Sequence, residues 1–382
     1  MTALDLPGTR LPRGGWKLVT LHWPILVLLT AIAGVGILAL YSAAGGSWEP
    51  WAGTHAARFA IGMVGLVVIA MVPITVWRTL APLAYIGALG LLVLVEFIGT
   101  VGMGAQRWIA IGPLVVQPSE VMKIAIVVAL AAYYARLPVE KVSRPLWVLL
   151  PLLLVLAPTA LVLQQPDLGT ALLLVLGGGA VMFIAGVSIW YFIVAGVGGA
   201  ALVTVVMRSE GTEWQLLKDY QFRRIHTFLD PSTDPLGAGY HITQATIAMG
   251  SGGWQGRGFM QGTQSRLNFL PEKHTDFVFT TLAEEFGFTG SATLLGLYAL
   301  VVVFCFVSAI ANRDRFGAIL TAGIGATFFL FFSVNIAMVT GLVPVVGVPL
   351  PLVSHGGSAM LVLLAAFGLM QSAHIHRPRL RA

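Results

Sequence analysis

The strongest constraint on the fold is a series of long apolar segments that carry almost no charge. Of the 382 residues, 57% are hydrophobic and only 10% are charged. The mean hydropathy of +0.87 is typical of a protein that crosses a membrane several times. Each segment approaches the length that a hydrocarbon layer of about 30 Å requires. We predict an all-α polytopic membrane protein with ten membrane-spanning helices, at 21–42, 57–76, 82–101, 119–136, 146–164, 168–186, 188–207, 288–311, 316–339 and 356–373.

Basic residues in the short connecting segments predict how the helices are oriented. With the N-terminus in the cytoplasm, most Lys and Arg fall on the cytoplasmic side, and the short opposite loops keep chiefly Arg58 and Arg107. The tails 1–20 and 374–382 are then cytoplasmic, and 208–287 is a large extracytoplasmic loop between the seventh and eighth helices. A loop of that length is often functional. We expect a retained first helix rather than a cleaved signal, and a single membrane domain over the whole chain.

Composition narrows the possible partners and cofactors. The chain has a net charge of +6 and a pI of about 9.7. Its basic residues are scattered and form no basic helix, so we predict no binding to nucleic acid. The high pI is better explained by the basic residues that membrane proteins keep on the cytoplasmic side and by binding of a lipid that carries phosphate. The single cysteine, Cys305, gives no disulfide framework. The sequence shows no convincing metal-binding spacing and no Ser-His-Asp arrangement.

The first polar cluster in the apolar background lies between the third and fourth predicted helices. Gln106 and Arg107 form a short polar stretch, and Glu120 and Lys123 follow at the start of the fourth helix. Because Glu120 and Lys123 are three residues apart, they share one helix face. Such a pair either neutralises itself inside the membrane or turns its lysine toward an anion in a pocket.

Two further clusters have both structural and functional interpretations. In the turn 164–170, Asp167 is expected to cap the following helix. In the large loop, Arg223 and Arg224 and the glycine-rich stretch 250–258 combine guanidinium groups with backbone that an anion can approach. Contact of the two arginines with lipid headgroups is an equally good explanation.

The last two segments of interest follow the large loop. Residues 344–358 contain three prolines and several glycines at membrane depth, which predicts the wall of a cavity, since lipid cannot satisfy irregular backbone. We assign His355 no catalytic role. Residues 272–285 concentrate ionisable groups, and Asp276 leads directly into an apolar segment. A carboxylate placed there is a candidate base, although an ordinary loop end solvated by headgroups has the same pattern.

Three ordered motifs resemble the SEDS family (shape, elongation, division and sporulation). They are Gly-Thr-Gln-Ser-Arg-Leu-Asn-Phe-Leu-Pro-Glu-Lys-His-Thr-Asp-Phe at 262–277, Gln-Pro-Ser-Glu at 117–120, and Pro-Leu-Pro-Leu-Val-Ser at 349–354. The resemblance covers essentially the whole chain. The start of the first motif, the Ala-Glu-Glu-Phe-Gly run at 283–287 and the short N-terminal tail resemble the RodA branch rather than the FtsW branch. His355 departs from the family pattern, where Tyr is more usual.

The resemblance implies a peptidoglycan glycosyltransferase of the bacterial cytoplasmic membrane that polymerises lipid II at the outer face for cell elongation. Glycosyl transfer from a pyrophosphate requires a base for the acceptor hydroxyl and positive charge for the leaving group. By motif, Asp276 matches the family's essential acid, and we expect it to be the general base. We expect substrate binding by eight further residues: Lys123, Glu120, Arg107, Lys273, Ser119, Gln106, Arg223 and Ser354.

The resemblance also implies partners, namely lipid II, the growing glycan strand, a class B penicillin-binding protein (a transpeptidase) and other membrane proteins of the elongation complex. A divalent cation sharing the charge of the leaving group is compatible with this chemistry, but the residues do not specify one. Two alternatives stay open. Ten helices with intramembrane charges also suit a lipid II flippase, although such a protein usually has an internal repeat and a midplane site. The second alternative is that the protein is a non-catalytic scaffold of the cell-wall synthesis complex.

Overall fold

The protein was analysed as a computed structural model that describes residues 16–102, 105–112, 114–215, 219, 222, 226–227, 230, 238–266 and 274–377. Within these residues, ten helices are long and apolar enough to cross a membrane, which confirms the predicted polytopic helical fold. They are α2 (Trp23–Ala43), α3 (Ala52–Met71), α4 (Ile74–Ile98), α5 (Pro118–Arg136), α6 (Pro145–Gln164), α7 (Leu168–Ala185), α8 (Ile189–Arg208), α12 (Val278–Ile310), α13 (Arg315–Val339) and α14 (Gly357–Ile375).

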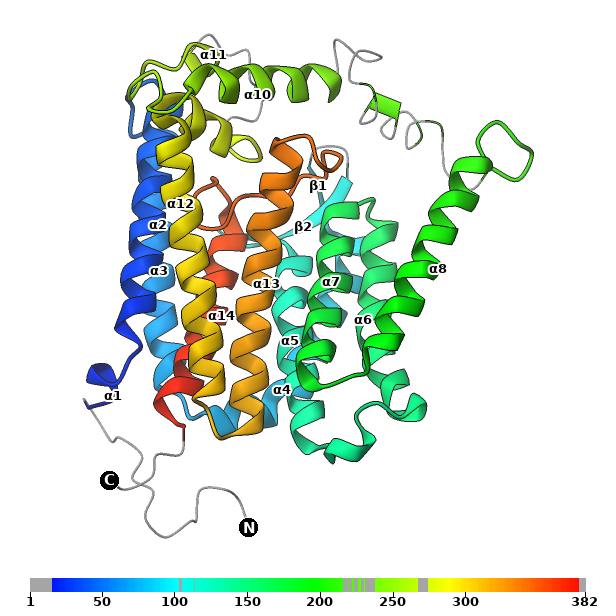
Figure 1. Ribbon diagram of the computed structural model, residues 1–382. Coiled ribbons are helices and arrows are strands. Elements are labelled where there is room, and N and C mark those ends of the chain that lie inside the picture. The colour runs from blue at the N-terminus through cyan, green and yellow to red at the C-terminus, as the bar shows by residue number, and fades with distance from the viewer. Residues whose placement is uncertain are drawn as a thin grey trace.

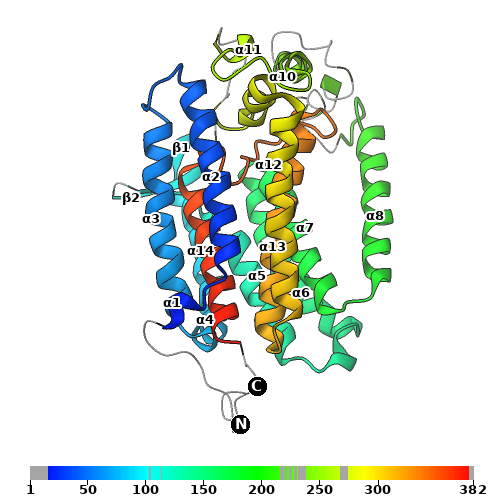
Figure 2. The same ribbon diagram turned by 60° about the vertical axis from the view of Figure 1, so that its left-hand side comes forward.

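The helices form a bundle with two different ends (Figure 1, Figure 2). The short helix α1 (Trp16–Val19) and the last turn of α14 lie at one end. Helices α10 (Ala238–Gly252) and α11 (Thr263–Arg266) lie across the other, which we call the α10 end. Helices α5, α13 and α14 are the most buried, whereas α8 buries none of its residues and stands apart in both views. The interior of the bundle is therefore built around α5, α13 and α14.

Three predicted spans, 57–76, 82–101 and 288–311, begin several residues later than the helices they correspond to, α3, α4 and α12. The difference at α4 has a clear cause. The N-cap of this helix is Pro73, and Pro82, near which the predicted span begins, lies inside the helix. A membrane helix tolerates an internal proline because neighbouring groups can satisfy the freed backbone carbonyl.

A small antiparallel sheet between α4 and α5 was not predicted. It contains β1 (Thr100–Gly102), β2 (Ala105–Ile111) and β3 (Leu114–Val116) in the order β1-β2-β3. Two of its strands have only three residues, and the seven residues of β2 do not alternate strictly between polar and apolar, so no period of two stands out in the sequence. The sheet is the structural setting of Gln106 and Arg107, which both lie on β2.

The predicted large loop also contains regular structure, because α10 and the first turns of α12 fall within 208–287. Helix α12 is interrupted at Gly287, whose φ of 64° and ψ of −158° suit only glycine. A Cβ there would lie 2.3 Å from the backbone nitrogen of Gly256. Hydrogen bonds from the Arg257 amide to the Glu284 carbonyl (3.0 Å) and from the Phe288 amide to the Gly253 carbonyl (2.8 Å) fasten this contact. The kink lets the start of α12 turn over the bundle at the α10 end.

Candidate active site

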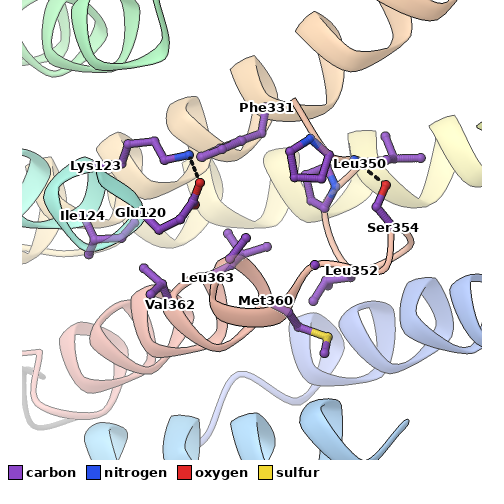
Figure 3. Close-up of a pocket in the computed structure, with 14 residues that line it drawn as sticks. Glu120, Lys123, Ile124, Phe331, Leu350, Leu352, Ser354, Met360, Val362 and Leu363 are labelled. Carbon is purple, nitrogen blue, oxygen red and sulfur yellow. Dashed lines mark hydrogen bonds and ion pairs between the residues drawn. The ribbon is translucent and has the colours of Figure 1, made fainter. Parts of the chain in front are cut away.

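A pocket opens between α5, α13, α14 and the segment that joins the last two, which we call the α13–α14 loop (residues 340–356) (Figure 3). It has about 480 Å³ of empty space, counting its open mouth. Its lining includes Glu120, Lys123, Phe331, Ser354 and the irregular backbone of 349–352. The α5 and α14 residues that line it come from the first turns of those helices, so the pocket lies toward the α10 end. The prediction that the proline-rich segment forms the wall of a cavity is confirmed.

Glu120 and Lys123 meet in this pocket as a buried ion pair. The Nζ atom of Lys123 lies 2.7 Å from Oε1 of Glu120, and the two side chains are only 2% and 8% exposed, respectively. Lys123 Nζ also lies 4.1 Å from the centre of the Phe331 ring, a cation–π distance. The two interpretations left open by the sequence are therefore compatible, because the pair neutralises itself and also lines a pocket. Binding of an anion by Lys123 stays a prediction.

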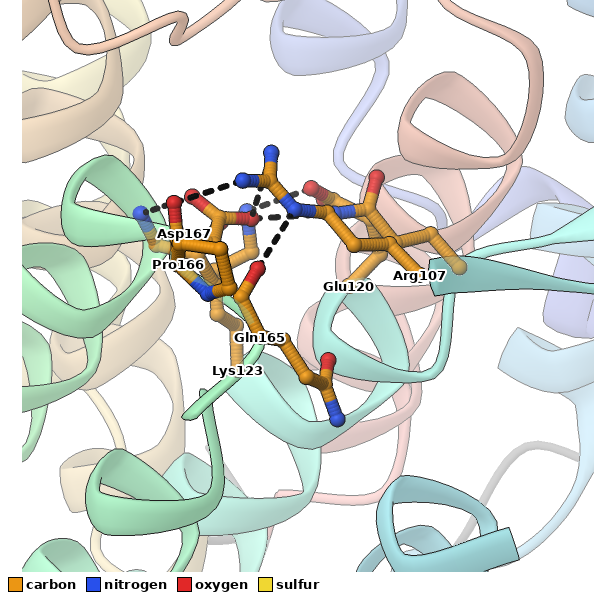
Figure 4. Close-up of polar contacts among 8 residues, drawn as sticks. Arg107, Glu120, Lys123, Gln165, Pro166 and Asp167 are labelled. Carbon is orange, nitrogen blue, oxygen red and sulfur yellow. Dashed lines mark hydrogen bonds and ion pairs between the residues drawn. The ribbon is translucent and has the colours of Figure 1, made fainter. Parts of the chain in front are cut away.

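Arg107 holds the turn that precedes α7 (Figure 4). Its Nε donates to the carbonyl of Gln165 (2.8 Å) and its Nη2 to that of Pro166 (2.6 Å). Its Nη1 lies 3.9 Å from Oδ2 of Asp167. The Asp167 carboxylate accepts hydrogen bonds from the backbone N–H (3.1 Å) and the hydroxyl (2.9 Å) of Thr170, which confirms the predicted cap of α7. A guanidinium group thus fixes the geometry of a polar turn at the membrane boundary.

Two other predicted residues are placed differently. Gln106 precedes Arg107 on β2, so its side chain lies on the opposite face of the strand, packed toward Gly99. Ser119 is 2% exposed, and its hydroxyl has no hydrogen-bond partner among the described residues. Neither residue lines the pocket. Lys273 and Arg223 lie outside the described residues.

The two residues that precede Asp276 are hydrogen-bonded to the α13–α14 loop. The Ser354 hydroxyl donates to the carbonyl of Thr275 and accepts from the amide of Leu350 (2.7 Å). The amide of His355 donates to the carbonyl of His274 (2.8 Å). Ser354 therefore uses its hydroxyl to join two segments that are distant in the sequence, in addition to lining the pocket.

Asp276 itself lies against the same loop. A Cβ on Gly347 would stand 3.6 Å from its Oδ2 atom, and Gly347 has a φ of +69°, where glycine is favoured. The side-chain amide of Asn335, on α13, donates to the main-chain carbonyl of Asp276 (3.1 Å) and to that of Val348 (2.6 Å). Asp276 does not line the pocket, but it borders the loop whose following residues do.

The α13–α14 loop is where the separate clusters come together. The start of α7, just after Asp167, approaches Val346 so closely that a Cβ on Gly169 would lie 2.4 Å from the Val346 carbonyl oxygen. Asp276 borders the next residue along the loop, and the Glu120–Lys123 pocket begins a few residues later. The glycine-rich stretch 250–258 does not line the pocket and packs instead against the kink in α12.

Asn335 is a site residue that the sequence analysis missed. It is fully buried, and its side-chain amide donates two hydrogen bonds that support backbone at and near Asp276. A single amide in an otherwise apolar span was the available signal, since polar side chains in membrane helices usually bond to other segments. Among the described residues, no group of three or more His, Cys, Asp or Glu side chains is arranged to hold a metal ion.

Comparisons with known proteins agree with this architecture. A family model described as a cell cycle protein of the FtsW, RodA and SpoVE type matches residues 19–379. The chain is 43% identical to the peptidoglycan glycosyltransferase MrdB of Escherichia coli K12, over 96% of both chains. It is 34% identical to a probable peptidoglycan glycosyltransferase FtsW of Pseudomonas fluorescens, over 92% of this chain and 87% of the relative.

Solved structures give the same result. A chain from a structure described as a peptidoglycan synthase complex that coordinates polymerization and crosslinking matches with a TM-score of 0.80 and 32% identity, covering 93% of this chain and 97% of that one. The rod shape determining protein RodA of Thermus thermophilus matches with a TM-score of 0.70 and 28% identity, covering 94% and 97%. Taken with ten membrane helices and a polar site at one end of the bundle, these similarities place the chain in the FtsW/RodA/SpoVE family of membrane proteins.

Proposed function

We propose that the protein is a peptidoglycan glycosyltransferase that polymerises lipid II into glycan strands at the outer face of the bacterial cytoplasmic membrane, for cell elongation. The observation that carries the proposal is the meeting of Asp276, the Glu120–Lys123 pair and the Arg107–Asp167 turn around one loop. Its support from relatives is the 43% identity to a peptidoglycan glycosyltransferase over 96% of the chain.

In the proposed reaction, the Asp276 carboxylate takes the proton from the acceptor 4-hydroxyl. The acceptor oxygen then attacks C1 of the donor sugar, and the bond from C1 to the pyrophosphate oxygen breaks. Lys123 stabilises the negative charge on the departing pyrophosphate, and Glu120 holds Lys123 in the pocket through their 2.7 Å contact. Arg107 has its donors on the turn before α7, so we propose that it supports the site mainly by fixing that turn. Roles for Lys273, Arg223, Ser119 and Gln106 in substrate binding stay predictions.

The orientation and the partners belong to the same proposal. We place both termini in the cytoplasm and the α10 end outside, because α1 and the last turn of α14 lie together at the opposite end. We treat the whole chain as one membrane domain. A class B penicillin-binding protein is the proposed partner, alongside other membrane proteins of the elongation complex, and the similarity to a chain from a peptidoglycan synthase complex supports it.

The structure favours polymerisation over lipid transport. The pocket is lined by the first turns of α5 and α14 and lies toward one end of the bundle. A transporter that works by alternating access is expected to hold its substrate near the membrane midplane. A buried ion pair in a pocket toward one end of the bundle is better suited to stabilising a leaving group than to carrying a lipid across.

Polymerisation of lipid II by the purified chain in detergent tests the proposal. We expect glycan polymer on a gel, with and without added transpeptidase, and a higher yield when the transpeptidase is present. Glycan formed in detergent cannot result from transport, because no membrane separates two compartments. If polymer is absent under both conditions while reconstituted vesicles still translocate lipid II, the flippase alternative replaces the proposal. If neither activity is found, the scaffold alternative does.

Replacing Asn335 by Leu is expected to lower the polymerisation rate at least about tenfold, because the change removes two hydrogen bonds that position the backbone at Asp276. The unfolding temperature should fall as well, since one buried and one partly buried carbonyl lose their donor. Thr340→Val, at the exposed C-cap that follows the same helix, is the matched control and should leave the rate unchanged. An Asn335→Leu variant as active as the wild type would show that this amide does not position the site.

A further inference from the structure

A second basic side chain, Arg58, lies against the end of the α13–α14 loop. Arg58, near the start of α3, has Nη1 3.3 Å from Nε2 of His355. Because arginine can only donate, His355 is the acceptor in this contact. The same Arg58 atom would lie 3.9 Å from a Cβ on Gly357, in the first turn of α14. The preceding residue, Gly356, lines the pocket. Arg58 thus lies next to the pocket wall at Gly356 and Gly357, two residues without side chains.

Arg58 carries a positive charge, since a guanidinium group is not deprotonated in proteins. Among the described residues, none of the ion pairs includes Arg58. The pKa of His355 is lowered to about 4 by burial first, and then by the nearby charges of Arg58, His55 and His274. His355 is therefore neutral at physiological pH, and within the described part of the chain no carboxylate forms an ion pair with Arg58. A guanidinium group without a carboxylate partner is expected to bind an anion.

The surroundings also suit an anion. Helix α14 has 19 residues, and its N-cap is Gly356, which has no side chain that could bond to the free N–H groups of the first turn. Its positive end adds to the potential created by Arg58. The ring of His274 is stacked on Trp51, with ring centres 4.4 Å apart and an interplanar angle of 5°. Arg58 is thereby linked through His355 and His274 to the segment that ends at Asp276.

We propose that Arg58 and the first turn of α14 form a second anion subsite, which binds the pyrophosphate of the acceptor lipid II. This inference rests on the proposed function. A polymerase of lipid-linked sugars must hold two pyrophosphates. The donor pyrophosphate leaves from the reacting carbon, beside the buried Lys123. The acceptor pyrophosphate lies one disaccharide away from the hydroxyl that reacts, so it needs its own cation at a distance from the base. Arg58 provides this cation, because it is linked through His355 and His274 to the segment that ends at Asp276.

Kinetics of an Arg58→Gln variant test the subsite. We expect the lipid II concentration for half-maximal rate, KM, to rise about tenfold or more, with kcat largely retained, because a charge-assisted contact to a bound anion is lost. Arg58→Lys should recover part of the loss. Arg208→Gln, the same change at an exposed site at the end of α8, is the matched control and should leave KM unchanged. An unchanged KM in Arg58→Gln, with thermal unfolding like that of the wild type, would overturn the proposal.

A binding measurement makes the test independent of turnover. Native mass spectrometry of the inactive Asp276→Asn protein should show two bound molecules at the lowest lipid II concentration that saturates it, and at that same concentration Asp276→Asn combined with Arg58→Gln should show mainly one. Two molecules bound with the same affinity by both proteins would overturn the subsite. If the wild type makes no polymer, the proposed function fails, yet the count of bound lipids still decides whether Arg58 binds a lipid-linked pyrophosphate.

Discussion

Replacing Asp276 by Asn is expected to lower kcat for lipid II polymerisation by about 10²–10⁴-fold, the usual contribution of a general base. The amide keeps the size of the side chain but cannot take the proton from the acceptor hydroxyl. The hydrogen bond from Asn335 goes to the main-chain carbonyl of residue 276, so it survives the substitution. The measurement is the initial rate of polymer formation at saturating lipid II with purified protein.

Two further variants sharpen this result. Asp276→Glu retains a base but moves it by one methylene, so it should keep more activity than Asn while staying well below the wild type. Asp219→Asn changes an exposed acid elsewhere in the segment between α8 and α12 and should leave the rate unchanged. If Asp276→Asn unfolds at the wild-type temperature and polymerises at a comparable rate, Asp276 is not the base.

Much of this fold was predictable because membrane helices have a strong signal. Ten apolar segments of sufficient length predicted ten helices, and the predicted start of the eighth span at 288 coincides with the kink at Gly287. The cap formed by Asp167 was predictable as well, because it depends only on residues within the same turn. Local chemistry of this kind can be read from neighbouring residues.

Features that depend on contacts between distant segments were not predictable in the same way. The sequence indicated that Glu120 and Lys123 share a helix face, but it could not show that Phe331 and the α13–α14 loop close a pocket around them. It offered no means of seeing that Asn335 supports the backbone of Asp276, 59 residues away. The sequence also provided no reason to assign Gln106 and Arg107 different positions in the site. Their side chains lie on opposite faces because both residues belong to the strand β2. The motifs identified the residues, and the packing of α5, α7 and α13 against one loop relates them to each other.

Removing the charge of Lys123 is expected to have two effects, which can be separated. Lys123→Met should lower kcat by about 10²–10³-fold, because the leaving pyrophosphate loses a cation in a site shielded from water. It should also lower the free energy of unfolding by about 3–5 kcal/mol, since Glu120 would stay buried without its partner. Loss of activity in this variant alone would therefore not distinguish a role in chemistry from a role in folding.

The double variant Glu120→Gln with Lys123→Met resolves this ambiguity. With both charges removed, no unpaired ion remains in the pocket, so the unfolding temperature should return toward that of the wild type. The polymerisation rate should stay low, because the cation is still absent. Purified wild type, the two single variants and the double variant, compared by thermal unfolding and initial rate, form a complete cycle. If the double variant regains both stability and near-normal polymerisation, the ion pair is purely structural and the leaving group must be stabilised by other residues. If stability returns without activity, the Lys123 charge acts on the substrate.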